Sequence, residues 1–234
     1  TLGYLGMDRT DDRTEKACEH IFQFQTAEGA FVSQTTETLL TEYERRLKKG
    51  RELPPTEEWV SGFIVEQQLS CLTGNMTAAL IRLGYENDPR VHKALRWLVK
   101  IQNRDGGWLC PYWKAHLRDT HGCFMATITS LDAFAEYPEQ LRTAQLKSAS
   151  AQGAEFLLAH HLFKSDHHGF RVIKPAWLEL SFPWLFYDIL RALVVVAKLG
   201  YSRDPRIDDA LEILLRKQRP DGRWILENTP SGRM

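Results

Sequence analysis

The sequence predicts an all-α fold built from helical hairpins, and two observations lead to this prediction. One pattern of residues recurs along the chain, which is the signature of a repeat architecture. Apolar residues around the repeated positions follow helical spacing, and no convincing alternating strand pattern is found. We interpret the 234 residues as a single domain, 1–234, with repeats near 1–32, 69–109, 120–160 and 183–225.

The clearest repeat joins two stretches of the chain that lie 116 residues apart, and every residue type of the first recurs in the second. The first copy comprises Leu83, Gly84, Tyr85, Asp88, Pro89, Arg90, Ala94, Gln102, Gly106 and Trp108. The second comprises Leu199, Gly200, Tyr201, Asp204, Pro205, Arg206, Ala210, Gln218, Gly222 and Trp224. A fainter third copy opens the chain and ends in Gln25, Gly29 and Phe31. Agreement at this many spaced positions indicates internal repetition.

Each repeat predicts one amphipathic helix followed by a turn. Asp88-Pro89 and Asp204-Pro205 are each suited to an N-cap with proline at the first helical position. Apolar residues then recur at helical spacing, and a turn rich in Asp and Gly follows Gln102. We expect this helix to be the outer, partly solvated member of a hairpin.

Three other stretches, 69–83, 120–135 and 183–199, are more apolar and carry fewer charges. Helices that are hydrophobic on most faces are buried. We therefore expect these stretches to be the inner helices of the hairpins, each paired with an amphipathic outer helix.

The turns share the spaced motif Gln-x-x-x-Gly-x-Trp, which is present at Gln102/Gly106/Trp108 and again 116 residues later. This motif resembles the repeat of squalene cyclases and prenyltransferases, and shorter segments resemble prokaryotic squalene-cyclase-like proteins. The resemblance implies an α/α toroid, in which inner helices line a central cavity and outer helices surround them. Six hairpins close the ring in that family, so we expect an incomplete or open toroid here. Absent residues or a neighbouring chain would then supply the missing helices, the latter in an oligomer that completes the ring.

Histidine and cysteine residues gather where inner helices are expected to begin. His121 and Cys123 lie at the start of one such helix, another starts near Tyr187 and Asp188, and Cys110 lies in the loop before the first. Prenyltransferase β-subunits, which the repeat resembles, hold zinc at such positions with a thiolate, an imidazole and a carboxylate. The resemblance therefore implies zinc at the residues His121, Cys123 and Asp188, with Cys110 or Cys71 as a further ligand. The alternative is that each is an ordinary packing or capping residue.

Aromatic side chains near the inner helices suit a hydrophobic or isoprenoid ligand in the cavity that the resemblance implies. We take Trp113, Phe124, Trp184 and Tyr187 as the candidates, with Trp59 and Phe63 also near inner helices. Aromatic faces attract cations, including carbocations. The alternative is that these rings only fill the core.

The composition excludes several classes of protein. Thirty basic residues balance thirty acidic ones, which argues against a nucleic-acid partner. The longest apolar stretch, 189–197, is too short to span a membrane and contains Arg191. Four cysteines form no disulfide framework and no signal peptide opens the chain, so we expect a cytoplasmic protein. The pair His160-His161 is expected to be a solvated helix end.

The function expected from these features is a zinc-binding toroid protein related to terpene cyclases and prenyltransferases. If it is an enzyme, a zinc-held thiol or water is the most concrete nucleophile. The proton-donating Asp-x-Asp-Asp motif of terpene cyclases is not matched, because two residues separate Asp8 from Asp11-Asp12. The alternative is a non-catalytic binding or scaffold module with structural zinc or no metal.

Overall fold

The computed structural model describes residues 2–110, 118, 120–182 and 184–229. Regular structure in these ranges is helical, with three isolated β-bridges and no strand. The prediction of an all-α fold is confirmed. None of the helices that the structure describes is both long and apolar enough to cross a membrane.

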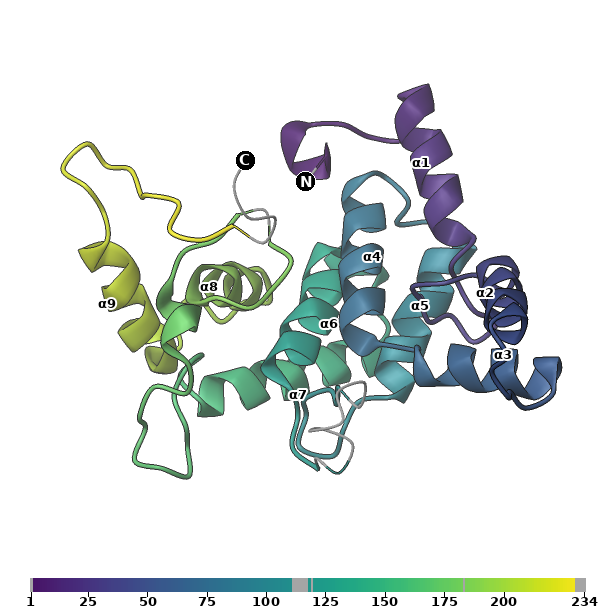
Figure 1. Cartoon of the computed structure of the whole chain (residues 1–234). Coiled ribbons are helices and arrows are strands. Elements are labelled where there is room, and N and C mark those ends of the chain that lie inside the picture. Colours follow the sequence, from purple (N-terminus) through teal and green to yellow (C-terminus); the bar gives the residue numbers. More distant parts are fainter. Residues whose placement is uncertain (1, 111–117, 119, 183, 230–234) are drawn as a thin grey trace.

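The α-helices follow one another with short connections, apart from the long segments that precede α6 and α8 (Figure 1). In chain order they are α1 (Asp12–Phe22), α2 (Thr36–Lys48), α3 (Thr56–Glu66), α4 (Ser70–Arg82), α5 (Pro89–Lys100), α6 (Phe124–Glu136), α7 (Ala144–Ala159), α8 (Ile189–Lys198) and α9 (Asp208–Arg216). A short 3-10 helix, Leu2–Leu5, opens the described chain and contacts α4.

The helices from α4 onward form two rows. In the first row α4 packs along α6, and α6 contacts α8; in the second, α5 contacts α7 (Figure 1). Each first-row helix also packs on its successor in the chain, which gives the hairpins α4–α5, α6–α7 and α8–α9. Helix α6 is central, with eleven of its thirteen residues buried. The closed ring of a toroid stays a prediction.

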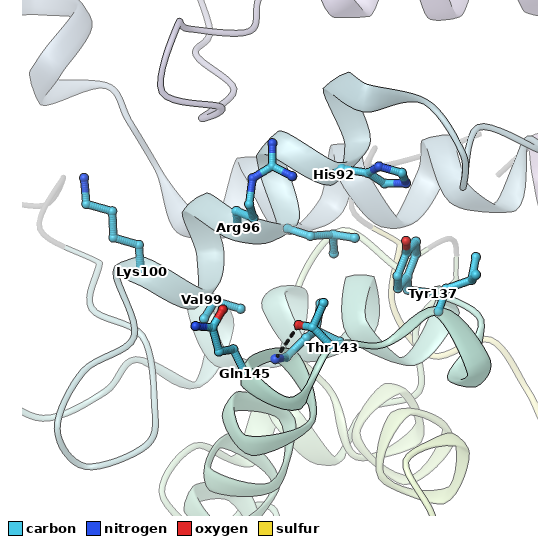
Figure 2. Close-up of a pocket in the computed structure, with 10 residues that line it drawn as sticks. His92, Arg96, Val99, Lys100, Tyr137, Thr143 and Gln145 are labelled. Carbon is cyan, nitrogen blue, oxygen red and sulfur yellow. Dashed lines mark hydrogen bonds between the residues drawn. The ribbon is translucent and has the colours of Figure 1, made fainter.

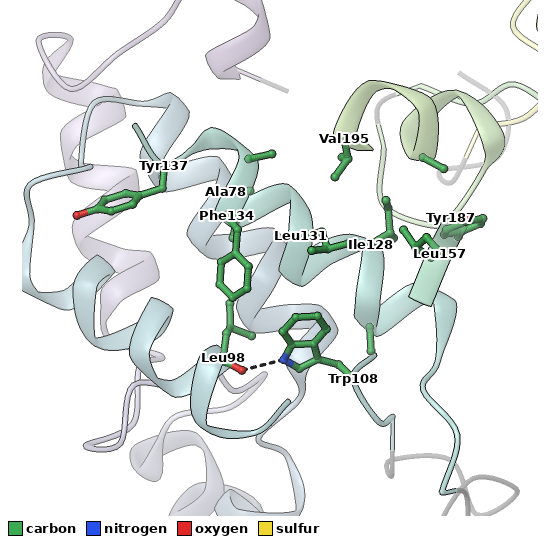
Figure 3. Packing of buried hydrophobic residues seen from close by; sticks show 14 of the residues in the cluster. Ala78, Leu98, Trp108, Ile128, Leu131, Phe134, Tyr137, Leu157, Tyr187 and Val195 are labelled. Carbon is green, nitrogen blue, oxygen red and sulfur yellow. Dashed lines mark hydrogen bonds between the residues drawn. The ribbon is translucent and has the colours of Figure 1, made fainter. Parts of the chain in front are cut away.

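Trp108 lies at the centre of the packing between the rows (Figure 3). Its indole N–H donates to the carbonyl of Leu98 in α5 at 2.8 Å, and its ring meets Phe134 of α6 edge-on, with centroids 5.7 Å apart. A side chain at Gly153 of α7 would come within 2.8 Å of this indole. The tryptophan of the repeat motif therefore joins α5, α6 and α7 in one core.

The glutamine of the motif bonds its own turn, and two of its three copies also bond a further helix. The Gln102 amide donates to its own turn at 2.7 Å and to the carbonyl of Ala149 in α7 at 2.9 Å. Gln25 makes the equivalent bonds to its own turn and to Arg90 in α5. Among the residues that the structure describes, Gln218 bonds its own turn alone, at 3.0 Å. The repeated residue types thus have a structural reason that is independent of any catalytic role.

Two of the predicted inner helices begin later than expected, because polar or backbone contacts hold the preceding residues out of the helix. Helix α8 starts at Ile189, since the Asp188 carboxylate caps it by accepting the Arg191 backbone N–H at 2.7 Å. Helix α6 starts at Phe124, since the Cys123 backbone N–H donates to the Trp108 carbonyl at 2.7 Å.

Trp59 and Phe63, expected near inner helices, come just before α4 in the chain. Both lie in α3, which pairs with α2 in a hairpin of its own. Their rings stack with centroids 5.5 Å apart, and Trp59 also contacts Tyr43 of α2. No motif of the repeat falls in this segment, so the repeat analysis gave no reason to expect this hairpin.

Candidate functional site

Three of the four cysteines meet, although they come from three separate segments. Cys71 lies in the first turn of α4, Cys110 in the segment after Trp108, and Cys123 is the N-cap of α6. Side-chain hydrogen bonds join Cys110 to Cys71 and to Cys123. We call these three residues the thiol cluster. Cys18 lies in α1, buried in the core, as a packing residue.

Backbone contacts hold the three segments together. The hydroxyl of Ser70, at the start of α4, donates to the Leu109 carbonyl at 2.9 Å. The bond from Cys123 to the carbonyl of Trp108 anchors the start of α6 to the same segment. Gly107 and Gly122 approach so closely that a side chain on either would come within 3.0 Å of the other's Cα. The segment 107–110 therefore sets the positions of both helix starts.

The environment separates the proton affinities of two of the thiols. The hydrogen bond from Cys110 lowers the pKa of Cys71 against the opposing effect of burial, and backbone N–H groups of the first turn of α4 assist. The hydrogen bond with Cys110, together with burial, raises the pKa of Cys123 well above its ordinary value. Negative charge in the cluster is therefore favoured on Cys71, while Cys123 keeps its proton.

His121 contacts aromatic rings close to the thiol cluster. Its ring centroid lies 5.1 Å from that of Phe156 and 5.3 Å from that of His160, and its Nδ1 is 3.0 Å from the Gly122 carbonyl oxygen. The expectation that His160 is part of a solvated helix end is wrong. His160 is buried, its Nδ1 lies 2.7 Å from the Phe156 carbonyl oxygen, and it forms part of this aromatic group.

Asp188 uses its carboxylate to organise the start of α8. One oxygen accepts the Arg191 backbone N–H, and the other accepts the backbone N–H of Ser181 at 3.1 Å and the Ser181 hydroxyl. Burial raises the pKa of Asp188 despite these bonds.

Within the described ranges, no group of three or more His, Cys, Asp or Glu residues is arranged to hold a metal ion.

Of the four cavity candidates, Phe124 and Tyr187 are buried in one aromatic group. Phe124 lies 4.7 Å from Trp177 and 5.4 Å from Tyr187, measured between ring centroids. The Tyr187 hydroxyl donates to the Leu162 carbonyl, and burial raises its pKa well above the ordinary value. These two rings fill core space.

Trp184 lies beside the 3-10 helix at the start of the chain, where its ring meets Tyr4 edge-on with centroids 5.8 Å apart. Its indole nitrogen is buried and has no hydrogen-bond partner among the residues described. Trp113 lies outside the described residues.

A buried ionic network on the inner helices was not anticipated. Asp132 of α6 lies between Arg191 of α8, at 2.8 Å, and Arg82 of α4. Arg191 also donates to the side-chain oxygen of Asn75 in α4 at 2.7 Å. Burial raises the pKa of Asp132, but the two guanidinium groups outweigh it and the pKa is lowered overall. The sequence did contain a signal for this network, because Asp132 and Arg191 are charged residues inside two otherwise apolar helices.

Comparisons with known proteins support the fold and name no activity. No family model matches the chain, and no curated protein matches it. A solved structure described as a protein from Actinoplanes is similar, with a TM-score of 0.51 and 15% sequence identity. The similarity covers 93% of this chain and 54% of that one, so the chain spans about half the length of the similar protein. At this identity the likeness concerns the fold alone.

Proposed function

We propose that this protein is a zinc-binding member of the α/α-toroid architecture and that the thiol cluster supplies the sulfur ligands. The observation that supports this proposal is the convergence of Cys71, Cys110 and Cys123 from three segments on one point at the start of two inner helices. Thiolates are among the preferred ligands of zinc.

The donors suit zinc in their chemistry but not in their present arrangement, since no three of the described His, Cys, Asp or Glu residues are placed to hold a metal ion. Cys71, whose pKa is lowered, is the first sulfur ready to bind as a thiolate. Cys123, whose pKa is raised, must give up its proton when the metal arrives. The hydrogen-bonded thiols are oriented toward one another, so they must turn toward an entering ion. His121, two residues before Cys123, is the candidate for a fourth ligand, whereas the capping bonds of Asp188 remove it from the proposed set.

Zinc bound at three sulfurs would leave one position for a nitrogen ligand, a water or a substrate group, and would lower the pKa of a water or thiol there. The proposed ligand is a hydrophobic or isoprenoid molecule. Half-exposed rings suited to it lie near the chain start, at the end of α4 opposite the thiol cluster, where Tyr4 meets Phe182 and Trp184 with centroids 5.9 and 5.8 Å away. The Arg82 guanidinium packs over the Tyr4 ring at 4.5 Å, although Asp132 and Glu136 compensate its charge.

Metal analysis of the purified protein tests the proposal. We expect about one zinc per chain in the unmodified protein after zinc supplementation and removal of unbound metal. Cys71→Ser and Cys123→Ser should each lose most of it, while Cys18→Ser, the matched control outside the cluster, should retain it. A zinc-free unmodified protein, or equal zinc in all variants, would overturn the proposal.

The second candidate function is a non-catalytic module with structural zinc, and it makes a different prediction for metal removal. If zinc is structural, chelation should lower the melting temperature strongly, because ligands that hold a closed site also hold the fold. If zinc serves a ligand site, chelation should abolish binding of a probe such as farnesyl diphosphate with little change in melting temperature.

A further inference from the structure

A groove of about 540 Å³ runs between α5 and α7 in the second row of helices (Figure 2). Its apolar lining comes from both helices and from the connection before α7. These residues are Leu95, Val99, Tyr137, Leu141 and Leu146. The volume lies within the range of about 300–1,000 Å³ that is usual for small-molecule pockets. We call this groove, with these residues and the basic rim described next, the outer groove.

The rim of the outer groove is basic. His92, Arg96 and Lys100 recur every four residues along α5 and therefore share one face of that helix (Figure 2). None of the residues lining the groove is acidic. Across the described part of the chain, neither Arg96 nor Lys100 takes part in an ion pair, whereas Arg90 at the start of the same helix is bound to Glu19 at 2.7 Å.

The groove continues along the two helices. A second hollow of about 420 Å³ shares Val99 and Gln145 with it and extends past Gln102 toward Gln152. The first turn of α7, capped by Thr143, carries no acidic residue, so the positive end of its helix dipole is not neutralised within that turn. An elongated ligand therefore finds apolar surface along its length and positive charge at the rim.

We propose that the outer groove binds a single-chain anionic amphiphile, such as a long-chain carboxylate. The alkyl chain would cover the apolar lining, and the anionic head would lie at Arg96 and Lys100. A neutral lipid would leave both cations uncompensated, and a free anion would leave the apolar lining exposed to water. The groove shares no residue with the thiol cluster, so its test is independent of the zinc proposal.

Titration calorimetry tests the proposal, with dodecanoate and dodecyl phosphate as probes below their micelle-forming concentrations. Both probes should bind at one site. Comparing the affinities of the carboxylate and the phosphate probe shows whether the groove prefers a fatty acid or a phosphate ester. The exposed double variant Arg96→Gln/Lys100→Gln should weaken binding of the preferred probe about tenfold or more, because two charge-assisted contacts are lost. Dodecanol should bind the unmodified protein more weakly by a similar factor.

A charge-matched control separates binding in the groove from nonspecific attraction between the anionic probe and the protein's positive charges. Lys48→Gln/Lys49→Gln removes the same charge at the end of α2 and should leave binding within about twofold, well under the 1.4 kcal/mol that tenfold represents. Equal weakening by both double variants, or no weakening by the groove variant, would overturn the proposal. Failure of both charged probes would also overturn it and favour an acidic protein segment as the occupant.

Discussion

At the scale of single residues, the thiol cluster is a set of groups with unequal proton affinities. Cys71 and Cys123 both contact Cys110, yet the pKa of the first is lowered and that of the second is raised. The difference comes from the hydrogen bond with Cys110, which lowers the pKa of Cys71 and raises that of Cys123, because backbone N–H groups lower the pKa of both. Of these two thiols, Cys71 is the one favoured as the nucleophile.

This division predicts the order in which the thiols react with iodoacetamide. Cys71 should be alkylated first near neutral pH, because the thiolate is the reactive form. Cys123 and Cys18, whose pKa values are raised, should follow more slowly. Peptide mass spectrometry over a time course measures the order. Alkylation of Cys123 before Cys71 would contradict the assignment of charge.

The buried carboxylate of Asp132 makes a prediction about stability. Asp132→Asn removes the charge shared by Arg82 and Arg191 and should cost about 3–5 kcal/mol of unfolding free energy at neutral pH, as for other broken buried ion pairs. Folding lowers the pKa of Asp132 below its ordinary value of 3.8. The stability that this carboxylate provides is therefore fully present above pH 3.8, and it is lost as the pH falls through the lowered pKa of the folded state.

Urea unfolding of both proteins between pH 3 and pH 7 measures this effect. The difference between the unmodified protein and Asp132→Asn should shrink as the pH falls below about 4, where the carboxylate becomes protonated. Asp12→Asn is the control, since Asp12 is an exposed carboxylate in the first turn of α1 and forms no ion pair with any described residue. A difference that stays constant with pH would contradict the role given to the charge.

At the scale of helices, the repeat motif joins neighbouring hairpins. The same glutamine occurs at Gln102 and Gln218, but only Gln102 reaches a following outer helix, through Ala149 of α7. The two positions therefore form a matched pair within one chain, in which the bond to the next hairpin is the main difference.

Gln102→Ala should accordingly destabilise the protein more than Gln218→Ala. The first leaves two partly buried carbonyls without their donor and should cost about 1–3 kcal/mol. The second removes one exposed bond and should cost about 0.5–1 kcal/mol. Unfolding free energies from urea titration decide between them, and equal losses would show that the bond to α7 contributes nothing.

At the scale of the whole molecule, the predictable part of the fold was the part that repeats. The spacing of Asp88, Gln102 and Trp108 and their copies predicted helix caps and turns, because each residue type has a local reason to occur there. The hairpin of α2 and α3 lies outside the repeat, so its sequence contains none of these motif residues. The helix start at Phe124 depended on a contact with a distant segment, the Trp108 carbonyl, which local periodicity does not encode. The start at Ile189 depended on the cap that the Asp188 side chain forms.

The sequence named the cysteines of the thiol cluster, while their role as metal ligands stays a prediction. Cys71, Cys110 and Cys123 were named from their positions near expected helix starts, and the structure brings them together. Asp188 occupies the predicted helix start, but the cap of α8 and Ser181 engage its oxygens. Sequence spacing places a carboxylate at a helix start without showing which donors it meets, and the same holds for His121 among its aromatic neighbours.

The most direct measurement of the central claim is a titration of the metal-free, reduced protein with cobalt(II), followed through the thiolate-to-cobalt charge-transfer band. Cobalt reports the ligands of a zinc site because it accepts the same soft donors. We predict a band that saturates at one equivalent, that weakens in Cys71→Ser and Cys123→Ser, and that is unchanged in Cys18→Ser. Absence of the band, or a band of equal intensity in all four proteins, would contradict the account.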